Sequence, residues 1–173
     1  MRTARPLAVL ATLLTVGLSA GLLLAPSVSA QPPFRLADYI TDNAAALSDS
    51  GRGTVTSAVN KLYTDRHIRL WVVYVDDFSG QAAVDWAQRT MRTSDLGDYD
   101  ALLAVATTSR AYAFLVPSTI KSVNTSQVDG LRRNKIEPAL HNGDWSGAAV
   151  AAANGLDASP GSSGRVILLA ALA

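Results

Sequence analysis

Ile68-Arg-Leu-Trp-Val-Val-Tyr-Val75 is a run of β-branched and aromatic residues that is apolar from Leu70 onward. Apolar runs of this length are typical of strands that are covered on both faces of a sheet. Asp76-Asp77 ends the run, and Ser79-Gly80 turns the chain. The sequence therefore predicts a central strand over 68–75, in a sheet that has helices on both sides.

A helix is predicted on either side of this strand along the chain. Residues 49–65 follow Ser48, a residue type that caps helix N-termini well. Their apolar positions recur at helical spacing, at Val55, Val59, Leu62 and Tyr63. Residues 81–93 are predicted to form the second helix. Its expected apolar face is Val84, Ala87 and Met91.

Two further strands are predicted close together, over 101–106 and 111–116. Only the segment 107–110 separates them, which indicates an antiparallel hairpin, and Pro117 stops the second strand. The order strand, helix, strand before the hairpin implies a right-handed crossover between two parallel strands.

Two more helices are predicted in the last third of the chain. The third begins after Thr125 or Ser126 as its cap, and Pro138 should end or kink it. Its expected apolar face is Val128, Leu131, Ile136, Ala139 and Leu140. The fourth runs from Trp145 to Leu156. The whole order predicts an α/β fold, a three-layer α/β/α sandwich with a small mixed sheet and about four helices.

The first 30 residues have the composition of a secretory signal peptide. Arg2 and Arg5 precede an uncharged stretch over 7–25, and Val28 and Ala30 would be the −3 and −1 residues of a cut before Gln31. An uncleaved membrane anchor through 7–25 is the alternative, because this stretch is just long enough to span a bilayer. In both cases we expect an extracytoplasmic protein, secreted or attached to the outer face of the plasma membrane.

The remaining chain divides into a domain over 31–156 and a tail over 157–173. The tail starts as Asp157-Ala-Ser-Pro-Gly-Ser-Ser-Gly164, which is typical of linkers, and ends in an apolar run. It is interpreted as a linker or as the start of a further segment.

Charge and motifs exclude several classes of function. The chain has 15 Lys and Arg against 14 Asp and Glu, and no basic run, so no nucleic-acid partner is expected. It contains no P-loop and no Gly-x-Gly-x-x-Gly turn, so no nucleotide cofactor is expected either. The cluster Arg132-Arg133-Asn-Lys135 is interpreted as a solvated helix face, with phosphate contact as the alternative.

The acidic residues give the candidate metal site. The chain has 13 Asp and one Glu, and carboxylates that converge without basic partners suit Ca²⁺ or Mg²⁺. The candidate ligands are Asp42, Asp76, Asp98 and Asp100. Asp76 follows the carboxyl end of the first predicted strand, whereas Asp98 and Asp100 precede a parallel neighbour, so sheet geometry alone does not join them. The alternative is that these residues shape turns. No catalytic residue is assigned.

Several stretches resemble one known family in order and spacing. Ile40-Thr-Asp42-Asn-Ala44-Ala-Ala-Leu47-Ser48 resembles its opening signature of an Asp, an Ala and then Leu-Ser before a long helix. Asp98-Tyr-Asp-Ala-Leu-Leu-Ala-Val-Ala106 is similar to its Asp-Asn-Gly-Val-Leu-Leu-Leu-Val-Ala strand, and Arg110 begins the next strand as a family Arg often does. Ile136-Glu-Pro138 and Asn142-Gly-Asp144-Trp145-Ser-Gly147 resemble its Ile-x-Pro and Gly-Asp-Tyr-x-x-Gly ending.

On these residues, over about 36–156, the chain resembles a secreted or membrane-associated bacterial member of the TPM domain family. This family is named after a thylakoid lumen phosphatase, a photosystem repair protein and a receptor modulator. The resemblance implies an extracytoplasmic α/β/α sandwich. It also implies weak acid phosphatase activity in some members and Ca²⁺ bound through Asp residues in others. The matching acids here are Asp42 and Asp98.

The sequence departs from the family pattern at two places that matter for activity. Tyr99-Asp100 stands where the family usually has Asn-Gly, and Leu115-Val-Pro117-Ser-Thr-Ile stands where it has a Gly-x-Gly-Leu-Glu turn. The second change removes a Glu. We therefore expect a non-catalytic binding or modulator module of the cell envelope, with Ca²⁺ as the expected cofactor and an envelope or membrane protein as partner. The alternative is a weak, divalent-metal-assisted acid phosphatase.

Overall fold

The computed structural model describes residues 30–158. Residues 1–29 and 159–173, which hold the predicted export segment and most of the predicted tail, lie outside this part of the chain. In chain order the elements are β1 (Ile40–Asp42), α1 (Asp49–Arg66), β2 (Arg69–Val75), α2 (Ala83–Thr93), β3 (Asp100–Ala106), β4 (Ala111–Leu115), α3 (Thr125–Leu131), the π-helical turn η1 (Arg132–Ile136), α4 (Glu137–His141) and α5 (Trp145–Asp157).

The four strands form one mixed sheet in the order β1-β2-β3-β4. β2 and β3 are parallel, with Arg69 opposite Asp100 and Val75 opposite Ala106, so the predicted parallel pair is confirmed. β3 and β4 are antiparallel, which confirms the predicted hairpin. β1 pairs in parallel with β2. This strand is not among the predicted ones, because three residues are too short to show an alternation of apolar and polar side chains.

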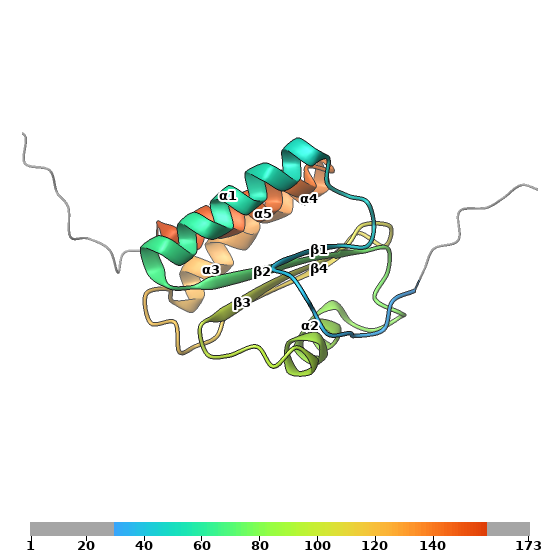
Figure 1. The fold of residues 1–173 in the computed structure, drawn as a ribbon, viewed down its shortest axis with the longest axis horizontal. Helices are drawn as coiled ribbons and strands as arrows, with labels where there is room; N and C mark the ends of the chain where they lie inside the picture. The colour runs from blue at the N-terminus through green and yellow to red at the C-terminus, as the bar shows by residue number, and fades with distance from the viewer. Residues whose placement is uncertain (1–29, 159–173) are drawn as a thin grey trace, which may run out of the picture.

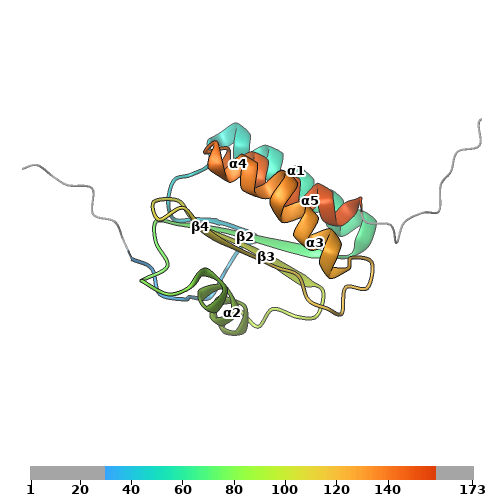
Figure 2. The same cartoon turned by 180° about the vertical axis from the view of Figure 1, so that it is seen from behind.

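Helices cover both faces of the sheet. α1, α3, α4 and α5 lie on one face and α2 alone covers the other, as the two opposite views show (Figures 1 and 2). β2 serves both layers in alternation: Leu70, Val72 and Tyr74 belong to the core under α1 and α5, whereas Val73 and Val75 belong to the core over α2. The predicted three-layer α/β/α sandwich is therefore confirmed.

The predicted apolar face of α2 is confirmed at Ala87 and Met91 and wrong at Val84. Val84 is 48% exposed, whereas the fully buried residues of the helix are Trp86, Ala87 and Thr90. The indole of Trp86 stacks on Phe78 at 4.8 Å, and its Nε1 donates to the carbonyl of Gln31 at 2.7 Å. The prediction is wrong at Val84 because burying a Trp removes more apolar surface from water than burying a Val.

The predicted third helix is a continuous rod that contains a π turn. Its N-cap is Asn124 rather than Thr125 or Ser126, and Asn124 forms a reciprocal capping box with Gln127. Pro138 neither ends the rod nor breaks it, because it is the second residue of α4, directly after η1. A proline has no N–H and clashes with the carbonyl four residues earlier in an α-helix. The wider π turn accommodates it.

The π turn also explains the spacing of the apolar face. Leu131 and Ile136 are five residues apart, a spacing that places two side chains on different sides of an α-helix. In η1 the N–H of Glu137 donates to the carbonyl of Arg132, so residues five apart lie above one another. Counting this rod once, the described residues contain four helices. None of them is both long and apolar enough to cross a membrane.

Candidate functional site

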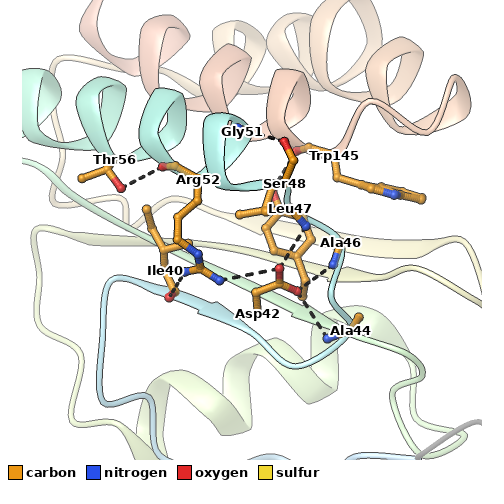
Figure 3. Close-up of polar contacts among 11 residues, drawn as sticks. Ile40, Asp42, Ala44, Ala46, Leu47, Ser48, Gly51, Arg52, Thr56 and Trp145 are labelled. Carbon is orange, nitrogen blue, oxygen red and sulfur yellow. Dashed lines mark hydrogen bonds and ion pairs between the residues drawn. The ribbon is translucent and has the colours of Figure 1, made fainter.

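Asp42, at the end of β1, is surrounded by hydrogen-bond donors. Its Oδ1 accepts from the backbone N–H groups of Ala44 at 3.3 Å and Ala46 at 3.0 Å, and its Oδ2 accepts from that of Leu47 at 2.9 Å. Arg52 of α1 adds an ion pair at 3.6 Å, and the Asp42 side chain is only 3% exposed (Figure 3). The carboxylate therefore fixes the loop between β1 and α1, which is the turn-shaping alternative raised for these acids.

The four candidate metal ligands lie at two opposite edges of the sheet. Asp42 pairs with Tyr74, two residues before Asp76, so these two acids belong to the edge formed by the carboxyl ends of β1 and β2. Asp100 pairs with Arg69 at the other end of β2, and Asp98 precedes it. Six residues of strand separate the two edges, about 20 Å at the usual rise.

The four carboxylates therefore do not converge on one ion. Among residues 30–158 there is no group of three or more His, Asp or Glu side chains that could hold a metal ion. The parallel register of β2 and β3 is the physical reason, because it keeps residues before one strand away from residues after its neighbour.

Asp98 and Asp100 have different environments despite their closeness in the sequence. Asp100 is 7% exposed, and its Oδ2 accepts from the backbone N–H of Gly97 at 2.6 Å. Its Oδ1 lies 3.9 Å from the Arg69 guanidinium and accepts no hydrogen bond in the described structure. Asp98 is exposed, and its carboxylate has no hydrogen bond or ion pair with any described residue. Asp100 is the first residue of β3, and its carboxylate thus shapes the turn before that strand.

A pocket lies at the opposite end of β3 from these two acids. Its volume is about 270 Å³, just below the usual range for ligand sites. The hairpin between β3 and β4 forms one wall, and α4 with the start of α5 forms the other. The lining residues are Val105, Ala106, Arg110, Ala111, Tyr112, Glu137, Leu140, His141 and Trp145. Aliphatic and aromatic side chains make up most of this lining.

Tyr112 of β4 forms hydrogen bonds with two charged side chains beside this pocket. Its hydroxyl donates to Oε1 of Glu137 at 2.5 Å and accepts from Nε of Arg132 at 3.3 Å. The Arg132 guanidinium also lies 5.7 Å from the centre of the Tyr112 ring. Burial, with the hydrogen bond to Glu137, raises the pKa of Tyr112. The hydrogen bond to Tyr112 raises the pKa of Arg132, which stays cationic.

The π turn brings these two partners to Tyr112. Arg132 begins η1 and Glu137 follows it, five residues later, and the backbone hydrogen bond between them stacks one above the other. In a regular α-helix the same two side chains would diverge. Single π turns in proteins are often found at functional sites.

Arg110 lines the pocket with a guanidinium that has no described partner. It is exposed, it is the last residue of the hairpin turn, and its φ of 52° lies in the left-handed region. Within residues 30–158 no hydrogen bond or ion pair engages its guanidinium. His141, in the last turn of α4, lies on the same pocket.

The sequence analysis does not assign Tyr112, Glu137, His141 or Trp145 to a site. Trp145 lies half-buried at the start of α5. One signal was available: the five-residue gap between Leu131 and Ile136 does not fit an α-helix, and it indicates a π turn beside Arg132 and Glu137.

A second, smaller hollow of about 120 Å³ lies between α1 and the start of β2. Tyr39 and Tyr63 line it, and each is nearly half exposed. The Arg69 guanidinium already lies 5.2 Å from the Tyr63 ring centre, and Tyr39 stacks on Trp71 at 4.6 Å. These side chains partner one another, so the hairpin pocket is the stronger candidate site.

The lining of the hairpin pocket includes one carboxylate and one formally charged cation. Its carboxylate, Glu137, is held by Tyr112 rather than placed against a Ser or Thr hydroxyl that could attack a substrate. Its formally charged cation is Arg110. These groups can fix the orientation of an apolar or aromatic ligand.

Comparison with known families identifies the domain. The model of a family described as the TPM domain matches residues 40–159. UPF0603 protein Rv2345 of Mycobacterium tuberculosis is 65% identical over 162 residues, which cover 94% of this chain and 24% of that protein. UPF0603 protein MT2410, from another strain of the same species, matches equally. The chain thus spans about a quarter of the length of these curated relatives.

Solved structures share the fold. The N-terminal domain of cg2496 protein from Corynebacterium glutamicum superposes with a TM-score of 0.63 at 24% identity, and the match covers 80% of this chain and 90% of that one. The N-terminal domain of a protein from P. gingivalis gives a TM-score of 0.61 at 13% identity, covering 69% and 79%. At these identities the likeness concerns the fold alone.

Proposed function

The chain belongs to the TPM domain family, and from that premise we propose that it is a non-catalytic binding module of the cell envelope. The hairpin pocket is the proposed binding site. The observation that carries this proposal is the pocket of about 270 Å³. Tyr112 and Trp145 line it together with aliphatic side chains, and the carboxylate of Glu137 accepts a hydrogen bond from Tyr112. Pockets with such a lining are the usual form of small-ligand sites.

The partner we propose is an envelope or membrane protein, and the location we propose is outside the cytoplasm. The signal-like residues 1–30 support that location. Expression in a bacterium that exports such signals should release a chain that begins at Gln31, as measured by N-terminal sequencing. A chain that keeps residues 7–25 and sediments with membranes would support the anchor instead, and a chain confined to the cytoplasm would contradict the proposed location.

The binding site is tested by nuclear magnetic resonance on the purified full chain. Phenylacetamide, a neutral aromatic probe, should shift the resonances of Val105, Leu140 and the Trp145 indole in a saturable way. Ala111→Phe, which fills the pocket from β4, should abolish these shifts. Ala82→Phe, at an exposed position before α2, is the matched control and should leave them unchanged. Absence of saturable shifts in the wild-type chain would contradict the proposed binding site.

The alternative, a metal-assisted phosphatase, has a specific readout. We expect no hydrolysis of p-nitrophenyl phosphate with Ca²⁺ or Mg²⁺ present, because the described residues contain no group of three or more His, Asp or Glu side chains that could hold a catalytic ion. Turnover that is lost in both Asp42→Ala and Asp98→Ala, with the fold intact, would restore the enzyme hypothesis.

Calcium binding stays a prediction, since the four proposed ligands lie at two edges of the sheet. Calcium chloride should raise the midpoint of thermal unfolding if the native chain binds the ion. A rise that disappears in Asp98→Ala would assign the ion to the loop before β3. No rise at any calcium concentration would remove the prediction.

A further inference from the structure

We infer that the hairpin pocket takes a ligand with a carboxylate head and an apolar body, and that Arg110 binds the carboxylate. This inference rests on the proposed function and names the class of ligand for the same site. It follows from three features: the apolar walls, the charges that the pocket leaves open, and the backbone at Arg110.

The walls fit an apolar or aromatic body. Val105 and Ala106 of β3 and Ala111 of β4 present small aliphatic side chains, and Leu140 of α4 faces the same space. Trp145, half-buried at the start of α5, adds an aromatic surface. A volume of about 270 Å³ holds a group of the size of a benzene ring with a short substituent.

The acids around the pocket are already engaged. Glu137 accepts from the Tyr112 hydroxyl at 2.5 Å. Asp144, which precedes Trp145, caps α5 by accepting from the N–H of Gly147 at 2.8 Å. A cationic ligand would therefore have to compete with existing hydrogen bonds, which weakens the case for it.

The two arginines near the pocket, Arg132 and Arg110, differ in whether they already have partners. Arg132 donates to the Tyr112 hydroxyl and lies 3.6 Å from a carboxylate oxygen of Asp129. Arg110 has no described hydrogen bond or ion pair. Its guanidinium is thus the one formally charged group of the pocket lining that is free, within the described residues, to bind an anion.

The backbone supports a role for this particular side chain. A φ of 52° is unfavourable for a residue with a Cβ, and Gly or Asn is the usual occupant of such a turn position. Arg has no conformational advantage there. An Arg at such a position beside a pocket points to a contribution from its side chain.

The head group is a carboxylate rather than a phosphate because the pocket has a single open cation. A guanidinium binds a planar carboxylate through two parallel hydrogen bonds, and the two charges compensate each other. A phosphate dianion beside one Arg would keep an uncompensated charge against apolar walls.

The test measures four probes that share a phenyl ring: phenylacetate, phenylacetamide, phenyl phosphate and phenethylammonium. Their dissociation constants come from the shifts of the Leu140 and Trp145 resonances in the full chain. We expect phenylacetate to bind about two- to fivefold more tightly than phenylacetamide, since a solvent-exposed, hydrogen-bonded charge pair contributes about that factor. Arg110→Asn, which suits the left-handed turn, should reduce phenylacetate binding to the level of phenylacetamide. Arg110→Lys should retain part of it.

The control is Arg89→Gln on α2, an exposed Arg on the opposite face of the sheet with no described partner. It should leave all four dissociation constants unchanged. Tighter binding of phenyl phosphate or of phenethylammonium than of phenylacetate would overturn the inference, as would an Arg110→Asn variant that keeps the wild-type preference. If phenylacetamide still binds in those cases, the proposed function stands. If no probe binds, the proposed function fails and the inference fails with it.

Discussion

At the scale of single residues, Asp42 shows how the surroundings of a carboxylate determine its role. Three backbone N–H groups and Arg52 share its two oxygens, and the side chain is almost fully buried. A metal ion would have to replace these donors. The residue that the family resemblance offers as a ligand is therefore a structural anchor of the loop before α1 in this chain.

Asp42→Ala should lower the free energy of unfolding by about 2–4 kcal/mol, because it leaves three loop N–H groups without their acceptor. Asp42→Asn should cost less, since the amide oxygen still accepts. Urea unfolding followed by circular dichroism measures both. Asp98→Ala is the matched control and should stay within about 0.5 kcal/mol, because the Asp98 carboxylate has no described partner. Equal effects of the two alanine variants would contradict this account.

At the scale of elements, α1 contains two glycines with different surroundings. A Cβ at Gly51 would lie 3.2 Å from Cβ of Ser146, where α1 approaches the start of α5. A Cβ at Gly53 would meet no atom within 4 Å. The first glycine therefore permits close packing of two helices, whereas the second only costs helix stability.

Gly53→Ala should raise the free energy of unfolding by about 0.5–1 kcal/mol, the usual gain of Ala over Gly in an exposed helix. Gly51→Ala, in the same helix, should gain less or lose stability, because the start of α5 must move. Thermal and urea unfolding of the two variants give the comparison. A larger gain at position 51 than at position 53 would show that the close approach to Ser146 is unimportant.

The rod from α3 to α4 depends both on its local sequence and on its contact with β4. Pro138 and the five-residue gap between Leu131 and Ile136 are properties of the sequence, and both fit a π turn. What the turn accomplishes depends on β4, since Tyr112 is the residue on which Arg132 and Glu137 converge. From the sequence alone, Arg132 is interpreted as part of a solvated helix face, because its partner Tyr112 lies 20 residues away.

At the scale of the whole molecule, Tyr74 links the sheet to the helical layer. Its hydroxyl donates to the carbonyl of Trp145 at 2.7 Å, from the central strand β2 to the first residue of α5. Burial raises the pKa of Tyr74 well above its ordinary value, and the negative charges of Asp42 and Asp144 add to the rise. The folded chain therefore keeps a proton on Tyr74 where the unfolded chain releases it.

The free energy of unfolding should consequently fall as the pH rises above about 10, where Tyr74 ionises in the unfolded chain only. The contribution of Tyr74 has a limiting slope of about 1.4 kcal/mol per pH unit, and it is fully present below pH 10. Urea unfolding between pH 8 and pH 11.5 measures it. Tyr74→Phe should unfold more easily at pH 8 and show a shallower decline above pH 10. Parallel curves for the two proteins would contradict the assignment.

The prediction from sequence succeeded where the signal is local. The apolar run of β2, the hairpin and the helical spacing in α1 and α5 each depend on residues within one element, so the layers of the fold followed from them. It failed for β1, which is too short to carry a pattern, and at Val84, where the competing Trp86 takes the buried position.

The candidate site depended on contacts that no local pattern encodes. The sequence by itself determined the α/β/α sandwich and the family, because periodicity and turn chemistry act over a few neighbouring residues. Only the tertiary structure separated Asp42 and Asp76 from Asp98 and Asp100, through the parallel register of β2 and β3. It also gathered Tyr112, Glu137 and Arg110 around one pocket. Such groupings arise when distant elements pack, and packing depends on the shape of the whole chain.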